Sequence, residues 1–200
     1  MKTTEQIRKE LQSIPVGEPF AITRLIATDA KNRGAVDQAV YTLVKKGAIQ
    51  RVAPGVFMVP KTSLLVGKVV PPDTKAVVRV IAEKNNSRVE IQGAEAAWRL
   101  GLTTQVPARP VFQTTGRTRA VKVGDKEVIL KHVSPRKLTL AGRPAGLALS
   151  ALYYLGKRGV SEKVIDTIRK RIAPEEFDVL KNAQLPVWMA EVINRYEHTK

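Results

Sequence analysis

The stretch "GAVDQAVYTLVKKGAIQRVAPGVFMVP", residues 34–60, places an amphipathic helical pattern directly before two apolar runs. Proline presets φ and glycine tolerates positive φ, so Pro54-Gly55 between these runs predicts the turn of a β-hairpin. The apolar residues of the helical pattern recur at spacings that bring them to one side of a helix: Val36, Val40, Leu43 and Val44. The stretch therefore predicts a helix followed by a hairpin.

The opposite side of this predicted helix is polar and carries groups that recognise nucleic acid. Gln38 has an amide that can read adenine, and Lys45 has an ammonium group for a phosphate. Small residues at the helix start would let its amide groups approach a phosphate. An ordinary solvated face is the alternative interpretation. We expect DNA contacts from this face, the residues just before it and the hairpin: Lys31, Asn32, Arg33, Gln38, Tyr41, Thr42, Lys45 and Arg51.

The first 62 residues have the element order of a winged helix-turn-helix domain. Apolar residues at helical spacing predict a first helix around residues 7–14 and a short second helix around residues 22–26. The helix and hairpin described above complete the order. We therefore predict a winged helix-turn-helix DNA-binding domain over residues 1–62, followed by a linker over residues 63–72 that ends in two prolines.

From Asp73 onward the pattern mixes helices with strands. It predicts a helix over 74–85, a strand over 88–92, a short helix over 93–101, strands over 110–116, 119–124 and 127–133, and helices from residue 143 to the end. Trp98 and Leu100 are expected to anchor the core. The predicted fold class is α+β, in which the winged helix-turn-helix precedes a mixed α/β domain, residues 73–200, with a small antiparallel sheet and a helical tail.

The chain carries 34 basic and 18 acidic residues among its 200, which gives a formal net charge of +16. A charge of this sign and size favours a polyanionic partner, most often nucleic acid. The absence of cysteine excludes disulfides, thiolate zinc sites and cysteine nucleophiles, and it fits a reducing compartment. The longest apolar-rich run, residues 144–156, falls short of the roughly 20 residues that cross a bilayer. We expect a cytoplasmic protein without membrane contact.

A second basic surface is predicted in the middle of the chain, where basic residues far outnumber acidic ones between Arg109 and Lys137. Several of them alternate with apolar residues along strands, which places them on a common exposed face. Such a face suits DNA, RNA or an acidic protein, and a solvated sheet face is again the alternative. Its expected members are Arg117, Arg119, Lys122, Arg136 and Lys137.

Three segments together resemble the AbiE-type (AbiEi-like) antitoxins of type IV toxin–antitoxin systems: "KKGAIQRVAPGVFMVP", "GAEAAWRLGLTTQVPARPVFQTTGRTR" and "ILKHVSPRKL". The resemblance covers roughly residues 5 to 155, and its most specific segment is "GAEAAWRLGLTTQVPARPVFQTTG", residues 93–116. It implies a phage-defence protein with an amino-terminal winged helix and a carboxy-terminal antitoxin domain.

The same resemblance implies a transcriptional repressor of its own operon that binds double-stranded DNA at inverted repeats of the promoter. It also implies that the second domain counteracts a nucleotidyltransferase-type toxin without forming a stable complex. Binding to inverted repeats requires two copies, and the chain has no visible coiled-coil seam. A monomer in solution that pairs on DNA is therefore expected.

An enzyme is the less favoured alternative. The two histidines, His132 and His198, have no recognisable metal-site spacing, and no phosphate-binding loop or dinucleotide fingerprint is present. We predict no catalytic residue, no metal site and no cofactor. Asp73 and Glu90 form a weak pair for a magnesium-dependent nuclease, but helix capping explains Asp73 better. A basic RNA- or protein-interaction module without sequence-specific DNA binding stays open.

Overall fold

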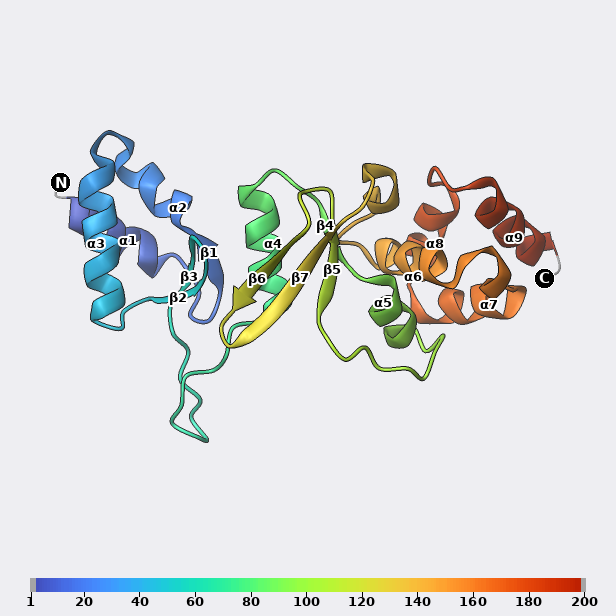
Figure 1. Cartoon of the computed structure of the whole chain (residues 1–200), viewed down its shortest axis with the longest axis horizontal. Coiled ribbons are helices and arrows are strands. Elements are labelled where there is room, and N and C mark those ends of the chain that lie inside the picture. The colour runs from blue at the N-terminus through green and yellow to red at the C-terminus, as the bar shows by residue number, and fades with distance from the viewer. Residues whose placement is uncertain (1–2, 199–200) are drawn as a thin grey trace. The chain divides into compact units, whose positions relative to one another are not determined.

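The structure is a computed structural model of the chain and describes residues 3–198 (Figure 1). The chain divides into two compact units. The first contains the chain up to Asn86 together with Ala120–Glu127, and the second contains Ser87–Arg119 together with the chain from Val128 onward. Over the described residues, no helix is long and apolar enough to cross a membrane.

The first unit begins with helices and a small antiparallel sheet (Figure 1). The predicted helices and hairpin are present. The strand β1 was not predicted, because three residues are too few to show a strand period. The elements are α1 (Thr3–Gln12), β1 (Pro19–Ala21), α2 (Ile22–Ile26), the short 3-10 helix η1 (Ala27–Asn32), α3 (Arg33–Lys45), β2 (Gln50–Ala53) and β3 (Val56–Met58).

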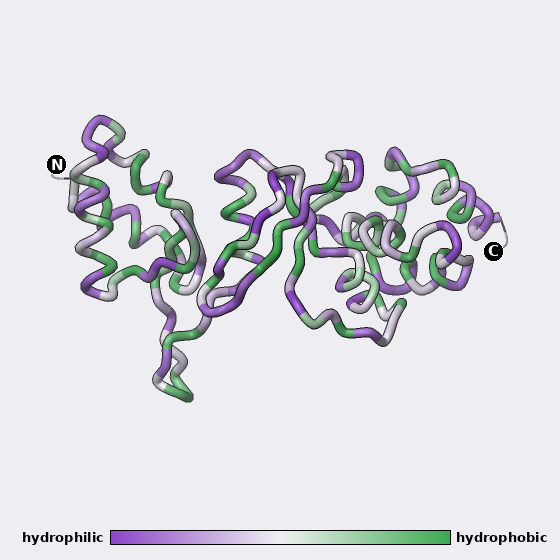
Figure 2. Tube along the Cα trace, viewed as in Figure 1, coloured by the Kyte–Doolittle hydropathy of each residue, from purple (hydrophilic) through white to green (hydrophobic). Residues whose placement is uncertain are grey.

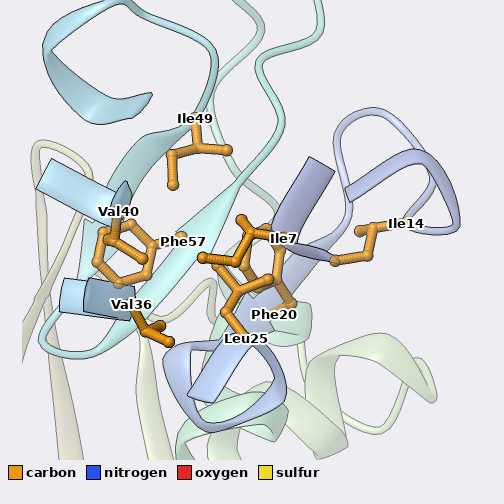
Figure 3. Packing of buried hydrophobic residues seen from close by; sticks show 8 residues of the cluster. All are labelled: Ile7, Ile14, Phe20, Leu25, Val36, Val40, Ile49 and Phe57. Carbon is orange, nitrogen blue, oxygen red and sulfur yellow. The ribbon is translucent and has the colours of Figure 1, made fainter. Parts of the chain in front are cut away.

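The core of this unit lies between its first helices and one face of the sheet (Figure 3). The strands pair antiparallel in the order β1-β3-β2. Phe20 lies opposite Phe57 in this register, and their ring centroids are 6.3 Å apart. The buried cluster joins α1, α2 and α3 to the sheet through Ile7, Ile14, Phe20, Leu25, Val36, Val40, Ile49 and Phe57.

The opposite face of the sheet is covered as well. Val56, Phe57 and Met58 of β3 are all buried, and side chains alternate along a strand, so Val56 and Met58 point away from the cluster that contains Phe57. The helix α4 (Thr74–Lys84) packs against β1 and β3. It belongs to the first unit, which therefore extends to Asn86, whereas the sequence predicted a boundary before Asp73.

The segment predicted as a linker, residues 63–72, is partly ordered into a hairpin. Thr62 and Val69 form an isolated antiparallel bridge, and the Val70 amide donates to the Lys61 carbonyl at 2.7 Å. The prolines that suggested a linker lie outside this hairpin, at positions 60, 71 and 72. The chain between β3 and α4 is thus a defined projection of the first unit.

The rest of the chain supplies the predicted strands and helices, and the α+β class is confirmed. The tip of the hairpin formed by β6 and β7, Ala120–Glu127, belongs to the first unit. The elements are β4 (Val89–Ile91), α5 (Gly93–Arg99), β5 (Val111–Thr114), β6 (Arg119–Val123), β7 (Lys126–His132), the 3-10 helix η2 (Pro135–Leu138), α6 (Pro144–Gly159), α7 (Glu162–Arg171), α8 (Pro174–Lys181) and α9 (Val187–His198).

The second sheet has the order β4-β5-β7-β6 and is mixed, whereas the sequence predicted an antiparallel sheet. β4 runs antiparallel to β5, but β5 runs parallel to β7, with Val111 opposite Ile129. The sequence predicts the β6–β7 hairpin because its two strands are joined by a short turn at Gly124. β5 pairs with the other edge of β7, and the direction of β5 relative to β7 depends on the path of the loop between β5 and β6, which the sequence does not show.

The helices α5 and α6 pack closely because small residues lie between them. Gly93, Ala96 and Ala97 are the buried residues of α5. Leu100 is buried as predicted, but Trp98 is 42% exposed, so its predicted core role is wrong. A helix advances about 100° per residue, which turns Trp98 away from the side occupied by Ala97.

We predict that Gly93→Ala destabilises the protein. A Cβ at this position would lie 2.5 Å from the Ser150 carbonyl oxygen and against the Tyr154 Cβ, so α6 would have to move. The expected loss is about 1–3 kcal/mol of unfolding free energy, measured by urea denaturation. Gly34→Ala on α3 is the control, since no described atom lies within 4 Å of its Cβ position. An unchanged Gly93→Ala midpoint would contradict this packing.

The carboxylate of Glu176 connects the start of α8 to the start of α6. Its Oε1 accepts hydrogen bonds from Arg143 Nη2 at 2.7 Å and Nε at 3.1 Å, and its Oε2 accepts from the Ala145 amide at 3.0 Å. The side-chain hydrogen bond from Arg143, followed by the amide of Ala145, lowers the pKa of Glu176 below its ordinary value. This carboxylate therefore stabilises the fold in its ionised form.

The pH dependence of this contribution has a definite sign. Because the pKa of Glu176 is lower in the folded chain, its contribution is complete above the ordinary value of 4.5 and is lost as pH falls through the lowered pKa. We expect Glu176→Gln to unfold at lower temperature than wild type at pH 7, and the gap to narrow steadily below about pH 4. Calorimetry across this pH range measures the difference in unfolding temperature between the two proteins. A difference that does not change with pH would refute the lowered pKa of Glu176.

Candidate nucleic-acid interface

The helix α3 separates its side chains into a buried and an exposed side. Val36 and Val40 are buried and Leu43 is half-buried, as the sequence predicted. Val44 is exposed instead, since it lies in the last turn of α3 at the rim of the contact with the core. The polar residues predicted for the opposite side are all exposed: Gln38, Tyr41, Thr42 and Lys45.

A local hydrogen bond orients one of these side chains. The Thr42 hydroxyl donates to the Gln38 carbonyl one turn earlier at 2.9 Å, which leaves its oxygen lone pairs facing outward as acceptors. Tyr41 is 62% exposed, so most of its ring is available to a partner. Thr42 can therefore accept a hydrogen bond from a partner, whereas Gln38 and Lys45 can donate one.

The residues before α3 are exposed too. Lys31 and Asn32 end η1, and Arg33 begins α3. The Arg33 Nε lies 3.9 Å from the Asp37 carboxylate, and both side chains are largely exposed. A pair of this length and exposure contributes little, so the guanidinium group stays available for an external anion. Gly34 follows in the first turn without any described atom near its Cβ position.

The turn of the hairpin after α3 contacts other elements of the first unit. Gly55 has φ +70°, as the predicted turn requires, and its carbonyl accepts from the Ile22 amide at 3.0 Å, while the Lys84 ammonium donates to the Pro54 carbonyl at 3.5 Å. The turn is thus held by α2 and α4. Phe57 and Met58 of the hairpin are buried in the fold, so neither offers a ring or side chain to a base.

Arg51 lies on β2, the strand that follows α3, and its side chain is exposed, as a DNA-contact residue requires. The edge of β2 is partly covered, because a bulge between Arg51 and Ala53 frees the Val52 carbonyl to accept from the Gly124 amide at 2.9 Å. We use the term α3 face for the exposed residues of this region, Lys31, Asn32, Arg33, Gln38, Tyr41, Thr42, Lys45 and Arg51.

The predicted second basic surface is divided between the two units. Lys122 is exposed but belongs to the first unit, whereas the other four residues belong to the second and are exposed there: Arg117, Arg119, Arg136 and Lys137. The sequence showed the strand alternation that exposes Lys122. It could not show that the chain passes from one unit to the other within the hairpin.

Within the second unit, the carboxyl ends of the parallel strands β5 and β7 meet at one edge. His132, at the end of β7, contacts the loop after β5: its amide donates to Thr118 Oγ1 at 2.9 Å, and its Nδ1 lies 2.8 Å from the Gly116 carbonyl. Arg117 lies between these two loop residues, and η2 with Arg136 and Lys137 follows β7 directly. The edge therefore gathers basic residues from separate segments.

Arg88 belongs to the same edge and was missed by the sequence analysis. Its amide donates to Thr115 Oγ1 at 2.9 Å, and its carbonyl accepts from the Thr115 amide at 3.1 Å. Its position directly before β4 was the available signal, but only the pairing of β4 with β5 brings it to Thr115. We call Arg88, Arg117, Lys131, Arg136 and Lys137 the basic edge.

Tyr153 of α6 supports η2 at this edge. The Lys137 ammonium lies 5.2 Å from the centroid of the Tyr153 ring, a cation–π distance. Burial raises the pKa of the Tyr153 phenol, and the positive charge of Arg136 opposes the shift. Tyr154, the next residue, is exposed and points outward.

The two carboxylates of the nuclease alternative have structural roles in different units. Asp73 accepts from the Lys75 amide at 3.0 Å as the N-cap of α4, as predicted. Glu90 is buried, and its Oε2 accepts from the Gly142 amide at 2.8 Å. In residues 3–198, no group of three or more potential ligands among His, Cys, Asp and Glu could hold a metal ion.

Comparison with known proteins matches the chain to one family over residues 6–180, described as a family of unknown function (DUF6088). The chain belongs to the DUF6088 family. The match includes the α3 face and the basic edge and ends at the last residues of α8. No curated protein and no solved structure shows a significant match to the chain.

Proposed function

We propose that this DUF6088 protein binds double-stranded DNA through the α3 face. The observation that carries the proposal is the division of α3, whose apolar side is anchored by Val36 and Val40 while its other side presents Gln38 and Lys45. The element order α1-β1-α2-α3-β2-β3 also supports a winged helix-turn-helix, with α3 as the recognition helix. The formal charge of +16 favours the same partner.

The α3 face carries groups for two kinds of DNA contact, one to base edges and one to phosphates. The Gln38 amide matches the donor and acceptor edge of adenine in the major groove. Lys45, Arg33 and Arg51 carry charges for phosphates, which hold a protein on DNA without reading sequence. The exposed first turn of α3 adds backbone amides that favour a phosphate.

We further propose that the protein is a cytoplasmic, non-enzymatic transcriptional repressor of its own operon. This step rests on the resemblance to AbiE-type antitoxins, which also implies that the second unit counteracts a nucleotidyltransferase-type toxin without a stable complex. Two copies would meet on the inverted repeats. The basic edge favours a second candidate role, contact with RNA or an acidic protein, that is independent of promoter binding.

Fluorescence anisotropy tests the first proposal. The full chain is titrated against DNA from the region upstream of its own gene and against a scrambled duplex, at several salt concentrations. A preference of roughly a thousandfold for the native fragment, together with a steep salt slope, supports a sequence-specific regulator. Equal, salt-sensitive binding to both duplexes would overturn sequence-specific regulation and favour the second candidate role.

Single substitutions on the α3 face should separate the recognition of bases from the attraction to phosphates. We expect Gln38→Ala to reduce the preference for the native duplex by about ten- to a hundredfold, because one base contact is lost. Lys45→Ala should weaken binding to both duplexes alike and lower the salt slope by about one. Lys163→Ala, an exposed lysine on α7, is the matched control. Wild-type behaviour of both α3 variants would exclude α3 as the reader.

Gly34→Ala separates folding from binding at the start of α3. Alanine favours a helix over glycine, and its methyl group meets no described atom, so we expect the free protein to gain about 0.5–1 kcal/mol of stability. The same methyl group would hinder a phosphate at the first turn, so affinity for DNA should fall. Thermal unfolding measures the stability and anisotropy measures the affinity. If both the stability and the affinity for DNA rise, a phosphate contact at the first turn of α3 is contradicted.

A further inference from the structure

The hairpin of residues 61–70, the 61–70 hairpin, has defined backbone hydrogen bonds. The Ser63 amide donates to the Lys68 carbonyl at 2.9 Å, and the Gly67 amide donates to the Ser63 carbonyl at 2.9 Å. Gly67 has φ +66°, which closes the turn. Just before the hairpin, the Val59 carbonyl accepts from the Gly17 amide at 2.9 Å, and Lys61 packs its aliphatic stem against Gly17. The hairpin is thus anchored at its base.

The tip of the 61–70 hairpin is apolar and unpacked. Leu64, Leu65 and Val66 are 103%, 97% and 66% exposed. Figure 1 shows this loop projecting away from the sheet, and Figure 2 colours its end as hydrophobic. Single exposed apolar residues are ordinary, but adjacent ones on a projecting loop mark an interaction site. These side chains contribute almost nothing to folding, since folding removes little of their surface from water.

The charge around the tip selects the kind of partner. Lys61 and Lys68 are exposed on the two sides of the tip, and no acidic residue occurs from Val59 to Pro72. An apolar end between two cations fits a surface with anionic walls and an apolar interior. The DNA minor groove has this chemistry, because phosphates line it and leucine side chains can wedge between its base steps.

An anionic lipid surface shares part of this chemistry, and an apolar pocket of another protein would fit the leucines alone. DNA is favoured because the 61–70 hairpin and the α3 face belong to the same compact unit. The Pro54-Gly55 turn is held by hydrogen bonds from Ile22 and Lys84. The hairpin is the projection of this unit that carries both cations and an exposed apolar tip.

We propose that the 61–70 hairpin inserts Leu64 and Leu65 into the minor groove of DNA while Lys61 and Lys68 contact the flanking phosphates. This inference rests on the proposed DNA binding through the α3 face and adds a second contact to it. Insertion of the leucines partly unstacks one base step and bends the duplex. Specificity would then include the ease with which that step deforms, because a pyrimidine–purine step unstacks most readily.

The test uses the full chain and duplexes from the region upstream of its gene, each carrying 2-aminopurine at a different position. Wild-type protein should raise 2-aminopurine fluorescence at one step, since unstacking relieves quenching. The double variant Leu64→Ala/Leu65→Ala should abolish this rise and bind about tenfold or more weakly, with an unchanged salt slope. Lys61→Ala/Lys68→Ala should lower the slope by about two.

Val106→Ala is the control, since Val106 is an exposed apolar loop residue of the second unit. It should behave as wild type, and all variants should unfold at the wild-type temperature. If wild type prefers its native duplex but no 2-aminopurine position brightens, or the leucine variant binds normally, the wedge is overturned and the α3 proposal stands. If wild type shows no preference for its native duplex, both proposals fall.

Two further assays identify the competing partners. Sedimentation with phosphatidylglycerol vesicles would overturn the inference if wild type binds them, the leucine variant does not, and the two bind DNA equally. Sedimentation velocity would overturn it in favour of a second copy of the chain if the leucine substitutions dissociate a dimer without changing DNA binding. Absence of both effects, together with the fluorescence result, supports insertion into DNA.

Discussion

Burial of β3 on both faces is the constraint on which the first unit depends. Val56, Phe57 and Met58 are an unbroken apolar run, so a helical layer must cover each face of the sheet. The cluster around Phe57 recruits α1, α2 and α3, and this fixes which side of α3 is exposed. The other face recruits α4, which also brings Lys84 to the Pro54-Gly55 turn. One short strand thereby orients the polar side of α3 and positions the helix that contacts the Pro54-Gly55 turn.

The distribution of polar groups follows from this packing. The α3 face lies opposite a tightly packed apolar side, so its residues are presented by a rigid element, which favours defined contacts with a partner. The 61–70 hairpin is different, because its base is hydrogen-bonded while its tip lacks described packing partners. An exposed leucine pair gains nothing from folding, so any benefit of these residues must arise from association. The α3 face and the apolar tip of the 61–70 hairpin therefore have complementary roles in the proposed binding of DNA by the first unit.

The second unit relies on small residues and on charged groups held by specific hydrogen bonds. Gly93 and its neighbours let α5 approach α6, while Glu90 and Glu176 accept amides at the segments that lead into helices. Parallel pairing of β5 with β7 brings their carboxyl ends together, and loops that are distant in sequence meet there. The basic edge is a consequence of this topology. Its cations are concentrated in space more strongly than along the chain.

Local pattern in the sequence determined the helices, most strands, the α+β class and the exposed polar side of α3, because these depend on residue spacing of 3.6 or 2. It also identified Asp73 as a helix cap. Only the tertiary structure decided that α4 joins the first unit and that the Pro54-Gly55 turn is held. It alone brought Arg88 to Thr115 and assigned Lys122 to the first unit. These features depend on contacts between segments far apart in the chain, and such contacts leave no periodic signal.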